Sequence, residues 1–175
     1  MTLVRWKRFT WNLEKTPPRG EASLPSFLIK GASREDERVT ADVILNALAL
    51  DYGWGDVLRG FRASIESQLG PAFHLQPVPA IVVRHGQRII AASLLTTEPD
   101  AETHLLSGPC VLSEYRNRGI GSALLLESLH FLHNAGLTTA SGITRESSTA
   151  EKFVYRKFGS VSAACEYEPE VLVHR

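Results

Sequence analysis

The spacing of apolar residues changes along the chain, and each change marks an expected change of secondary structure. Apolar residues recur at helical spacing over residues 34–50 and again over 56–69, where Gly70-Pro71 is expected to end the second helix. From residue 80 to residue 95 there are two largely apolar runs, 80–83 and 89–95, that flank His85-Gly86-Gln87. Such runs are typical of two buried strands joined in a hairpin.

The second half of the chain predicts a further strand, a long helix and a terminal unit of helix and strands. Residues 119–135 are the clearest helix, because most of their apolar side chains share one half of the helical wheel. Gly108-Pro109 interrupts a strand expected over 104–112, and since proline has no N–H to donate, the pair predicts a bulge or a local parting of strands. The other expected elements are strands at 27–29 and 138–144, a short helix at 148–159, and one or two strands within 161–173.

Taken in order, these elements predict an α/β (α+β) fold in which helices pack on a mixed sheet. Residues 23–175 would form this domain, and residues 1–22 would form an N-terminal extension. In the extension, Trp6, Phe9 and Trp11 are interspersed with basic and polar residues. Two interpretations stay open: a short strand or arm that packs on the main domain, or an arm that packs on a partner subunit in a homodimer.

Composition narrows the classes of function. The chain has 175 residues, and its 19 Lys and Arg balance its 19 Asp and Glu, so the net charge is zero. This balance argues against a dedicated nucleic-acid binder, which needs a clustered basic face. No run approaches the roughly 20 apolar residues of a membrane span, and no apolar stretch follows the basic N-terminus. We therefore expect a cytoplasmic protein without nucleic-acid or membrane partners.

The cysteines and histidines predict no metal site. Cys110 and Cys165 are too few for a disulfide framework and lack metal-ligand spacing, so free thiols are the expected state, with a disulfide between them as the alternative. His130 and His133 lie three residues apart on the polar face of the long helix, but a metal site needs more ligands.

The most informative segment is residues 111–123, where an expected strand runs through a glycine-containing turn into the long helix. Free N–H groups and the positive end of the helix dipole converge at such a turn. Gly119 and Gly121 remove side chains, so that an anion can touch the backbone, and Arg116 and Arg118 add positive charge. The segment therefore predicts a pyrophosphate site, but it lacks the lysine of a Walker loop and the third glycine of a dinucleotide fingerprint.

This turn resembles the acetyl-CoA motif of the GNAT superfamily of N-acetyltransferases, which reads Arg or Gln, two residues of any type, Gly, any residue, then Gly or Ala. Residues 116–121, Arg-Asn-Arg-Gly-Ile-Gly, match it at each position. Residues 153–159, Phe-Val-Tyr-Arg-Lys-Phe-Gly, resemble the second family signature, an aromatic-rich helix that ends in Tyr-x-x-x-Gly. The resemblance implies a central mixed, mostly antiparallel sheet of about six or seven strands, flanked by about four helices.

The resemblance also implies roles in binding acetyl-CoA. Amides of the turn would hold the pyrophosphate with help from the two arginines, and the strand before it would pair with the pantetheine arm like an added strand. Ser148 starts the later helix, where many relatives have asparagine, although capping of that helix explains it equally. The candidate cofactor-binding residues are Cys110, Val111, Leu112, Arg116, Asn117, Arg118, Gly119, Ile120, Gly121, Ser122 and Ser148.

Tyr155 corresponds to the family tyrosine that protonates the departing CoA thiolate, a task for which a phenol is suited. The alternative is aromatic packing against the cofactor arm. A general base is harder to find, because the strand positions where relatives often place one fall near Leu105 and Ser107. The nearest titratable residues are His104, Glu98 and Glu102.

Pro109 argues against fast catalysis. In the family a backbone amide near this bulge polarises the acetyl carbonyl, and proline has no N–H. A donor of this kind is worth about 2.7–4 kcal/mol in a transition state. Either the Cys110 amide polarises the acetyl carbonyl instead, or catalysis is weak. A covalent role for the Cys110 thiol is not expected, because no His–Asp arrangement supports it.

Two functions of different classes stay open. The leading one is an acetyl-CoA-dependent N-acyltransferase that transfers an acetyl group to a primary amine by direct transfer in a ternary complex. The alternative is a catalytically weak or inactive CoA-binding sensor or interaction module. The acceptor is expected beside the first two helices, where Tyr52, Trp54 and Phe61 offer an aromatic wall that suits an apolar or aromatic amine.

Overall fold

The computed structural model of the protein describes residues 5–19, 24–51 and 53–173. Within these residues seven strands form two antiparallel sheets, ordered β2-β3-β4-β5 and β6-β1-β7. The strands are β1 (Trp6–Asn12), β2 (Phe27–Gly31), β3 (Ala80–His85), β4 (Arg88–Leu94), β5 (Cys110–Val111), β6 (Thr139–Arg145) and β7 (Val161–Cys165).

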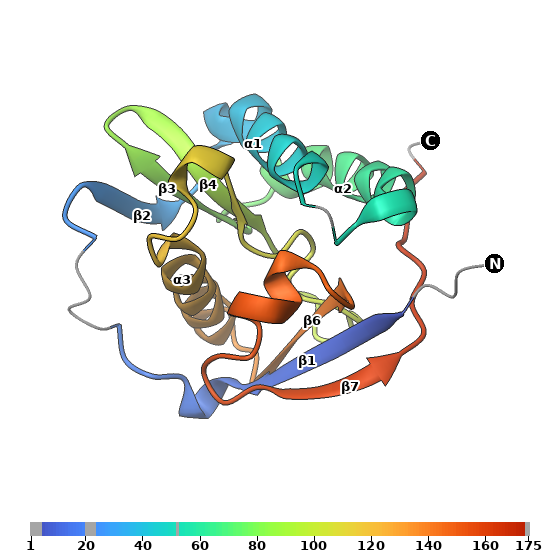
Figure 1. The fold of residues 1–175 in the computed structure, drawn as a ribbon. Coiled ribbons are helices and arrows are strands. Elements are labelled where there is room, and N and C mark those ends of the chain that lie inside the picture. Colours follow the sequence, from blue (N-terminus) through green and yellow to red (C-terminus); the bar gives the residue numbers. More distant parts are fainter. Residues whose placement is uncertain (1–4, 20–23, 52, 174–175) are drawn as a thin grey trace.

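Helices cover both faces of the four-stranded sheet (Figure 1). Helices α1 (Glu37–Ala49) and α2 (Leu58–Phe73) lie on one side, α3 (Ile120–Asn134) lies on the other, and the short π-helix η5 (Ala150–Val154) precedes β7. Side chains alternate along β3, so Ala80 and Val82 join the core beneath α1 and α2, whereas Ile81 and Val83 join the core beneath α3. This architecture confirms the predicted α+β class.

The N-terminal segment supplies the middle strand of the second sheet. β1 lies between β6 and β7 and pairs with both of them in antiparallel register. Phe9 and Trp11 are buried in the core beside α3, and Trp6 is buried against Trp54. Residues 6–12 therefore pack on the main domain, as the first of the two interpretations expected, and the domain boundary at residue 22 stays a prediction.

Two expected element boundaries are wrong. Helix α2 continues through Gly70-Pro71 to Phe73, because Ala72 and Phe73 are buried and their burial outweighs the one hydrogen bond that proline removes. The strand expected over 104–112 is reduced to Cys110–Val111 and a single bridge between Leu95 and Leu105.

The two sheets part beside β5. The segment before β5 crosses to β6, where the amides of His104 and Leu105 donate to the Ser141 carbonyl at 2.7 and 3.2 Å. Beyond this crossing β5 pairs with β4, and no ladder among the described strands joins β5 to β6. The parting of strands that Gly108-Pro109 predicts is therefore present.

No helix among the described residues combines the length and the apolar character that crossing a membrane requires.

Candidate functional site

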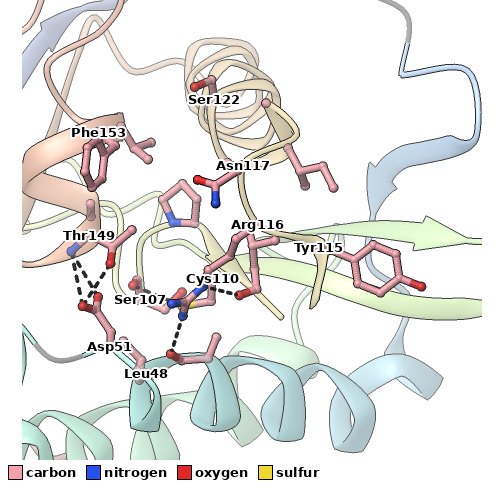
Figure 2. A pocket seen from close by; sticks show the side chains of 18 of the residues that line it. Leu48, Asp51, Ser107, Cys110, Tyr115, Arg116, Asn117, Ser122, Thr149 and Phe153 are labelled. Carbon is pink, nitrogen blue, oxygen red and sulfur yellow. Dashed lines mark hydrogen bonds between the residues drawn. The ribbon is translucent and has the colours of Figure 1, made fainter. Parts of the chain in front are cut away.

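A cavity of about 450 Å³ lies where the two sheets part. Its walls come from the C-terminal end of α1, from β5, from the turn before α3 and from η5 (Figure 2). Asn117 and Ser122 of the turn lie toward one end of the cavity, and Asp51 and Thr149 lie toward the other. The cavity therefore joins the predicted anion site to the loop that follows α1.

The turn before α3 has the geometry of an anion site. Asn117 and Gly119 both adopt left-handed backbone, with φ of 63° and 78°, a conformation that glycine and asparagine tolerate best. The first bond within the helix runs from the Ala123 amide to the Gly119 carbonyl at 3.1 Å. The amides of residues 120–122 therefore have no acceptor within the helix, and the positive end of the helix dipole adds to their field.

A lysine that sequence reasoning missed completes this end of the cavity. Lys157 lies just beyond η5, and its Nζ donates to the Ser122 hydroxyl at 2.6 Å. Lys157 and Ser122 both line the cavity. No motif pointed to Lys157, because only the fold brings residues 35 positions apart to the same helix end.

The two arginines of the motif have different surroundings. Arg116 lines the cavity, but its Nε donates to the Val111 carbonyl at 3.3 Å and its Nη2 donates to the Ala47 carbonyl at 3.1 Å. It thus ties the last turn of α1 to β5. Arg118 lies over the ring of Tyr115 at 5.3 Å, and its side chain is not among those that line the cavity.

The free edge of β5 faces the cavity. Leu112 donates its amide to the Ile90 carbonyl at 3.0 Å, and Cys110 lies opposite Ala92. Because amides alternate in direction along a strand, the Cys110 amide points toward β4 and the Val111 amide points toward the cavity side. Val111 therefore has the first amide after Pro109 that the register directs to the cavity. The Cys110 amide, which is one of the two expectations for polarising the acetyl carbonyl in place of the missing Pro109 amide, points away from the cavity.

The two cysteines are free in the structure. Burial raises the pKa of the Cys110 thiol to about 12, so the side chain is a protonated thiol at neutral pH. Over the described residues no group of three or more His, Cys, Asp or Glu side chains is arranged to hold a metal ion.

Tyr155 lies behind the wall of the cavity. Its ring is buried and packs edge-to-face on Trp11, with 5.4 Å between ring centroids. Its hydroxyl lies against Gly108, between Ser107 and Pro109, which line the cavity, and a side chain at Gly108 would collide with it. Among the described residues this hydroxyl has no hydrogen-bond partner, and burial raises the pKa of Tyr155 well above its usual range. The hydroxyl is thus protonated, its raised pKa makes it a weaker acid than a free phenol, and its catalytic role stays a prediction.

Two further candidates for cofactor binding, Ser148 and Leu112, do not line the cavity. The Ser148 side chain is buried, where it shares a 2.7 Å hydrogen bond with the Thr144 hydroxyl and accepts from the Glu151 amide at 3.1 Å. These bonds fit the capping alternative, since they occupy the hydroxyl at the start of η5. The other candidate residues of the turn and of β5 do line the cavity, namely Cys110, Val111, Arg116, Asn117, Gly119, Ile120, Gly121 and Ser122.

None of the titratable residues considered as a base lies in the cavity wall. His104 is buried, its Nδ1 accepts from the Ser141 amide at 3.0 Å, and its Nε2 lies 3.0 Å from the Glu98 carbonyl, to which it donates. Burial lowers the pKa of His104, so the ring is neutral and both nitrogens are occupied. Glu102 is exposed and lies 3.7 Å from Arg8.

A carboxylate that the sequence analysis did not single out does line the cavity. Asp51 follows α1, and Oδ1 accepts from the Thr149 hydroxyl at 3.0 Å, while Oδ2 accepts from the Thr149 amide at 3.2 Å. Gly53 permits this contact, because a side chain there would collide with the backbone of Ser148. The loop after α1 and the start of η5 are thereby held together at one end of the cavity.

The predicted aromatic wall is present in part. Trp54 lines the cavity, whereas Phe61 stacks behind it with 4.0 Å between ring centroids. Tyr52 lies outside the described residues. Phe153 lines the cavity from η5 with 67% of its surface exposed, which makes it a second aromatic group at this opening.

Comparisons with known proteins show which family part of the chain resembles. Residues 78–159 match the family model of the acetyltransferase (GNAT) domain. Over these residues, the match confirms the resemblance that the two motifs indicated. No curated protein matches the chain.

Solved structures show the fold likeness. A GCN5-related N-acetyltransferase from Sphaerobacter thermophilus and a GNAT-family acetyltransferase from Colwellia psychrerythraea are each 18% identical to the chain with a TM-score of 0.62. Both alignments cover 93% of this chain, and they cover 50% and 54% of those chains. A Drosophila protein is 13% identical with a TM-score of 0.63, over 93% of this chain and 50% of its own. The chain thus spans about half the length of these structures.

Proposed function

We propose that this chain, with its GNAT-like domain, is an acetyl-CoA-dependent N-acyltransferase that acetylates a primary amine by direct transfer in a ternary complex. The observation that carries the proposal is the cavity between the parted sheets. One end meets unpaired amides and a lysine, which suit a pyrophosphate, and the other end holds a carboxylate and aromatic rings, which suit an organic amine.

Different residues along the cavity would bind different parts of acetyl-CoA. The amides of residues 117–122 and Lys157 would bind the pyrophosphate, and the free edge of β5 would pair with the pantetheine arm. Acetyl-CoA supplies an activated acyl group as a thioester. We assign polarisation of its carbonyl to the Val111 amide, since Pro109 has no N–H and the strand register directs the Val111 amide away from β4.

The transfer step needs one proton donor and releases one proton. The amine nitrogen forms a bond to the acetyl carbon, the carbon–sulfur bond breaks, and the Tyr155 hydroxyl gives its proton to the departing thiolate. The proton released from the nitrogen passes to water, and Tyr155 regains a proton from water. The closeness of the Tyr155 hydroxyl to Gly108, between two residues that line the cavity, supports this assignment.

Release of free CoA thiol tests the proposal. Purified protein is incubated with acetyl-CoA and each of a panel of primary amines, namely alkylamines, arylalkylamines, polyamines and amino-acid amides. We expect amine-dependent thiol release, with the acetylated amine recovered by mass spectrometry. Thiol release that does not depend on any amine, with no acetylated product, contradicts the N-acyltransferase.

Pro109 favours a second candidate function, a CoA-binding module with weak or absent catalysis. Its position in the cavity wall, directly before β5, removes an amide that could polarise a carbonyl. Tight binding of CoA without turnover in the amine panel would support this candidate. Replacement of Pro109 by alanine, which restores an amide proton, would then be expected to raise thiol release.

The expected partners and setting belong to the same proposal. We propose a small-molecule or peptide amine as the acceptor, with neither nucleic acid nor membrane as a partner, and a cytoplasmic location.

A further inference from the structure

Asp51 lines the cavity as a carboxylate held only by uncharged donors. These donors are the amide of Gly53 at 3.2 Å and the amide and hydroxyl of Thr149. Among the described residues no lysine, arginine or histidine side chain forms an ion pair with Asp51. A half-buried carboxylate whose hydrogen-bond donors are all uncharged keeps its negative charge unpaired, so it attracts a positively charged ligand.

The Asp51 carboxylate can also accept a further hydrogen bond. A carboxylate offers about four lone-pair sites, two on each oxygen. Oδ1 already accepts from Gly53 and Thr149, whereas Oδ2 accepts from the Thr149 amide. Oδ2 is therefore the atom with room for a further donor.

The surroundings of Asp51 suit an apolar group next to a charged one. Leu48, Trp54 and Phe153 line the same cavity, and Phe153 is largely exposed at its rim. Cys110 of β5, where the thioester arm is proposed to lie, is near enough that the Asp51 charge adds to burial in raising the thiol pKa, while the Arg116 charge lowers it. The carboxylate, the aromatic rings and Cys110 therefore line one cavity.

We infer that Asp51 binds the ammonium group of the acceptor, and that the acceptor is a primary amine with an apolar body that packs on Leu48, Trp54 and Phe153. This inference rests on the proposed function, because it names the acceptor class of the same cavity. Asp51 acts by binding and orienting the ammonium group, and it selects cationic acceptors over neutral analogues of the same shape. The bound ammonium gives one proton to water before the neutral nitrogen attacks the acetyl carbon, because only the neutral amine has a free lone pair.

The test compares a cationic probe with its neutral counterpart. Phenethylamine and 2-phenylethanol are each titrated by calorimetry at pH 7 into protein saturated with CoA. We expect the wild type to prefer the amine, and Asp51→Asn to weaken amine binding about 10- to 100-fold, as loss of a charge-assisted bond implies, while leaving alcohol binding unchanged. Asparagine keeps the side-chain oxygen that accepts from Thr149, so the variant removes charge with little change of shape.

A matched variant separates the charge at Asp51 from charge elsewhere. Asp100→Asn removes an equal charge at an exposed turn and should leave amine binding as in the wild type. If Asp51→Asn does not fold, Asp51→Ser replaces it in the same titrations, because serine also offers an oxygen without charge, and it should weaken amine binding while leaving alcohol binding unchanged.

Two outcomes overturn the inference. They are equal affinity of the wild type for amine and alcohol, and unchanged amine affinity in folded Asp51→Asn or folded Asp51→Ser. If these occur while CoA binds and amine-dependent thiol release is normal, the N-acyltransferase stands and only the role of Asp51 fails. If CoA itself does not bind, the proposed function fails.

Discussion

Lys157 Nζ donates to the Ser122 hydroxyl at 2.6 Å, directly at the N-terminal end of α3. The contact places a positive side chain from the end of η5 beside three amides that lack an acceptor within the helix. An ammonium group and the free amides of a helix N-terminus both attract anions. We therefore propose that the pyrophosphate of CoA binds beside this pair.

Replacing Lys157 by methionine should weaken CoA binding about tenfold, the loss expected for one charge-assisted contact of roughly 1.4 kcal/mol. The aliphatic stem and the backbone carbonyl, which accepts from Trp11 Nε1 at 2.9 Å, are retained. Calorimetric titration with CoA measures the change. Lys152→Met, an exposed lysine on η5 outside the cavity wall, is the matched control and should bind normally. Equal affinity in both variants would remove Lys157 from the site.

Tyr155→Phe should reduce turnover about 10²- to 10⁴-fold, the usual worth of a general acid. Stability should hold, because the hydroxyl has no hydrogen-bond partner among the described residues and the ring keeps its contacts with Trp11. Steady-state thiol release with an identified amine gives the turnover, and calorimetry should show unchanged affinity for acetyl-CoA. Tyr167→Phe, in a tyrosine that packs on Trp6 and does not line the cavity, is the control. Near-normal turnover in Tyr155→Phe would rule out the acid role.

Much of the turn could be predicted from the sequence because its determinants are local. The helix after Gly119 follows from apolar periodicity, and the exposed amides follow from the helix start itself. The interruption at Gly108-Pro109 follows from the chemistry of proline. These features depend on neighbours within a few residues, which a sequence displays directly.

The rest of the site depends on contacts between distant segments. Asp51 meets Thr149, and Lys157 meets Ser122, only after the sheets have formed. Arg116 matches the family motif, yet its guanidinium donates to carbonyls of α1 and β5, and these acceptors come near it only in the folded chain. The predicted end of α2 at Gly70-Pro71 is wrong for the same reason, since burial of Ala72 and Phe73 in the tertiary structure outweighs a local helix-stop signal.

Trp11→Ala should destabilise the protein by about 3–5 kcal/mol. The indole is buried, its Nε1 donates to the Lys157 carbonyl, and it packs on Tyr155 in the middle strand of the second sheet. Urea unfolding followed by circular dichroism measures the loss. Lys15→Ala, in an exposed side chain of the same N-terminal segment, should change stability by less than about 0.5 kcal/mol. A small effect at Trp11 would mean that the segment adds little to the fold.

Glu151→Gln should lower stability at neutral pH by about 1–3 kcal/mol, and the difference should disappear in acid. Burial opposes ionisation of this carboxyl, but hydrogen bonds from Lys7 and Arg156, both 2.8 Å, outweigh it and lower the pKa of Glu151. The pKa of Glu151 is lower in the folded than in the unfolded protein. The stabilisation is therefore present at pH values above the usual glutamate pKa, and it is lost as the pH falls through the lowered pKa. Urea unfolding at several pH values tests this, with exposed Glu14→Gln as control. A difference that does not change with pH contradicts it.

The most direct test of the central claim, that the turn before α3 binds CoA, is a calorimetric titration of acetyl-CoA into the wild type, Gly119→Val and Gly86→Val. Both glycines have positive φ, 78° and 61°, and a Cβ at either meets no atom within 4 Å, so the two substitutions strain the backbone alike. Gly119 lines the cavity, whereas Gly86 lies in the turn between β3 and β4, outside the cavity wall. We predict that the wild type and Gly86→Val bind acetyl-CoA equally and that folded Gly119→Val has lost at least ~90% of the affinity, because its side chain stands where the pyrophosphate meets the backbone. Unchanged affinity in folded Gly119→Val would contradict the account.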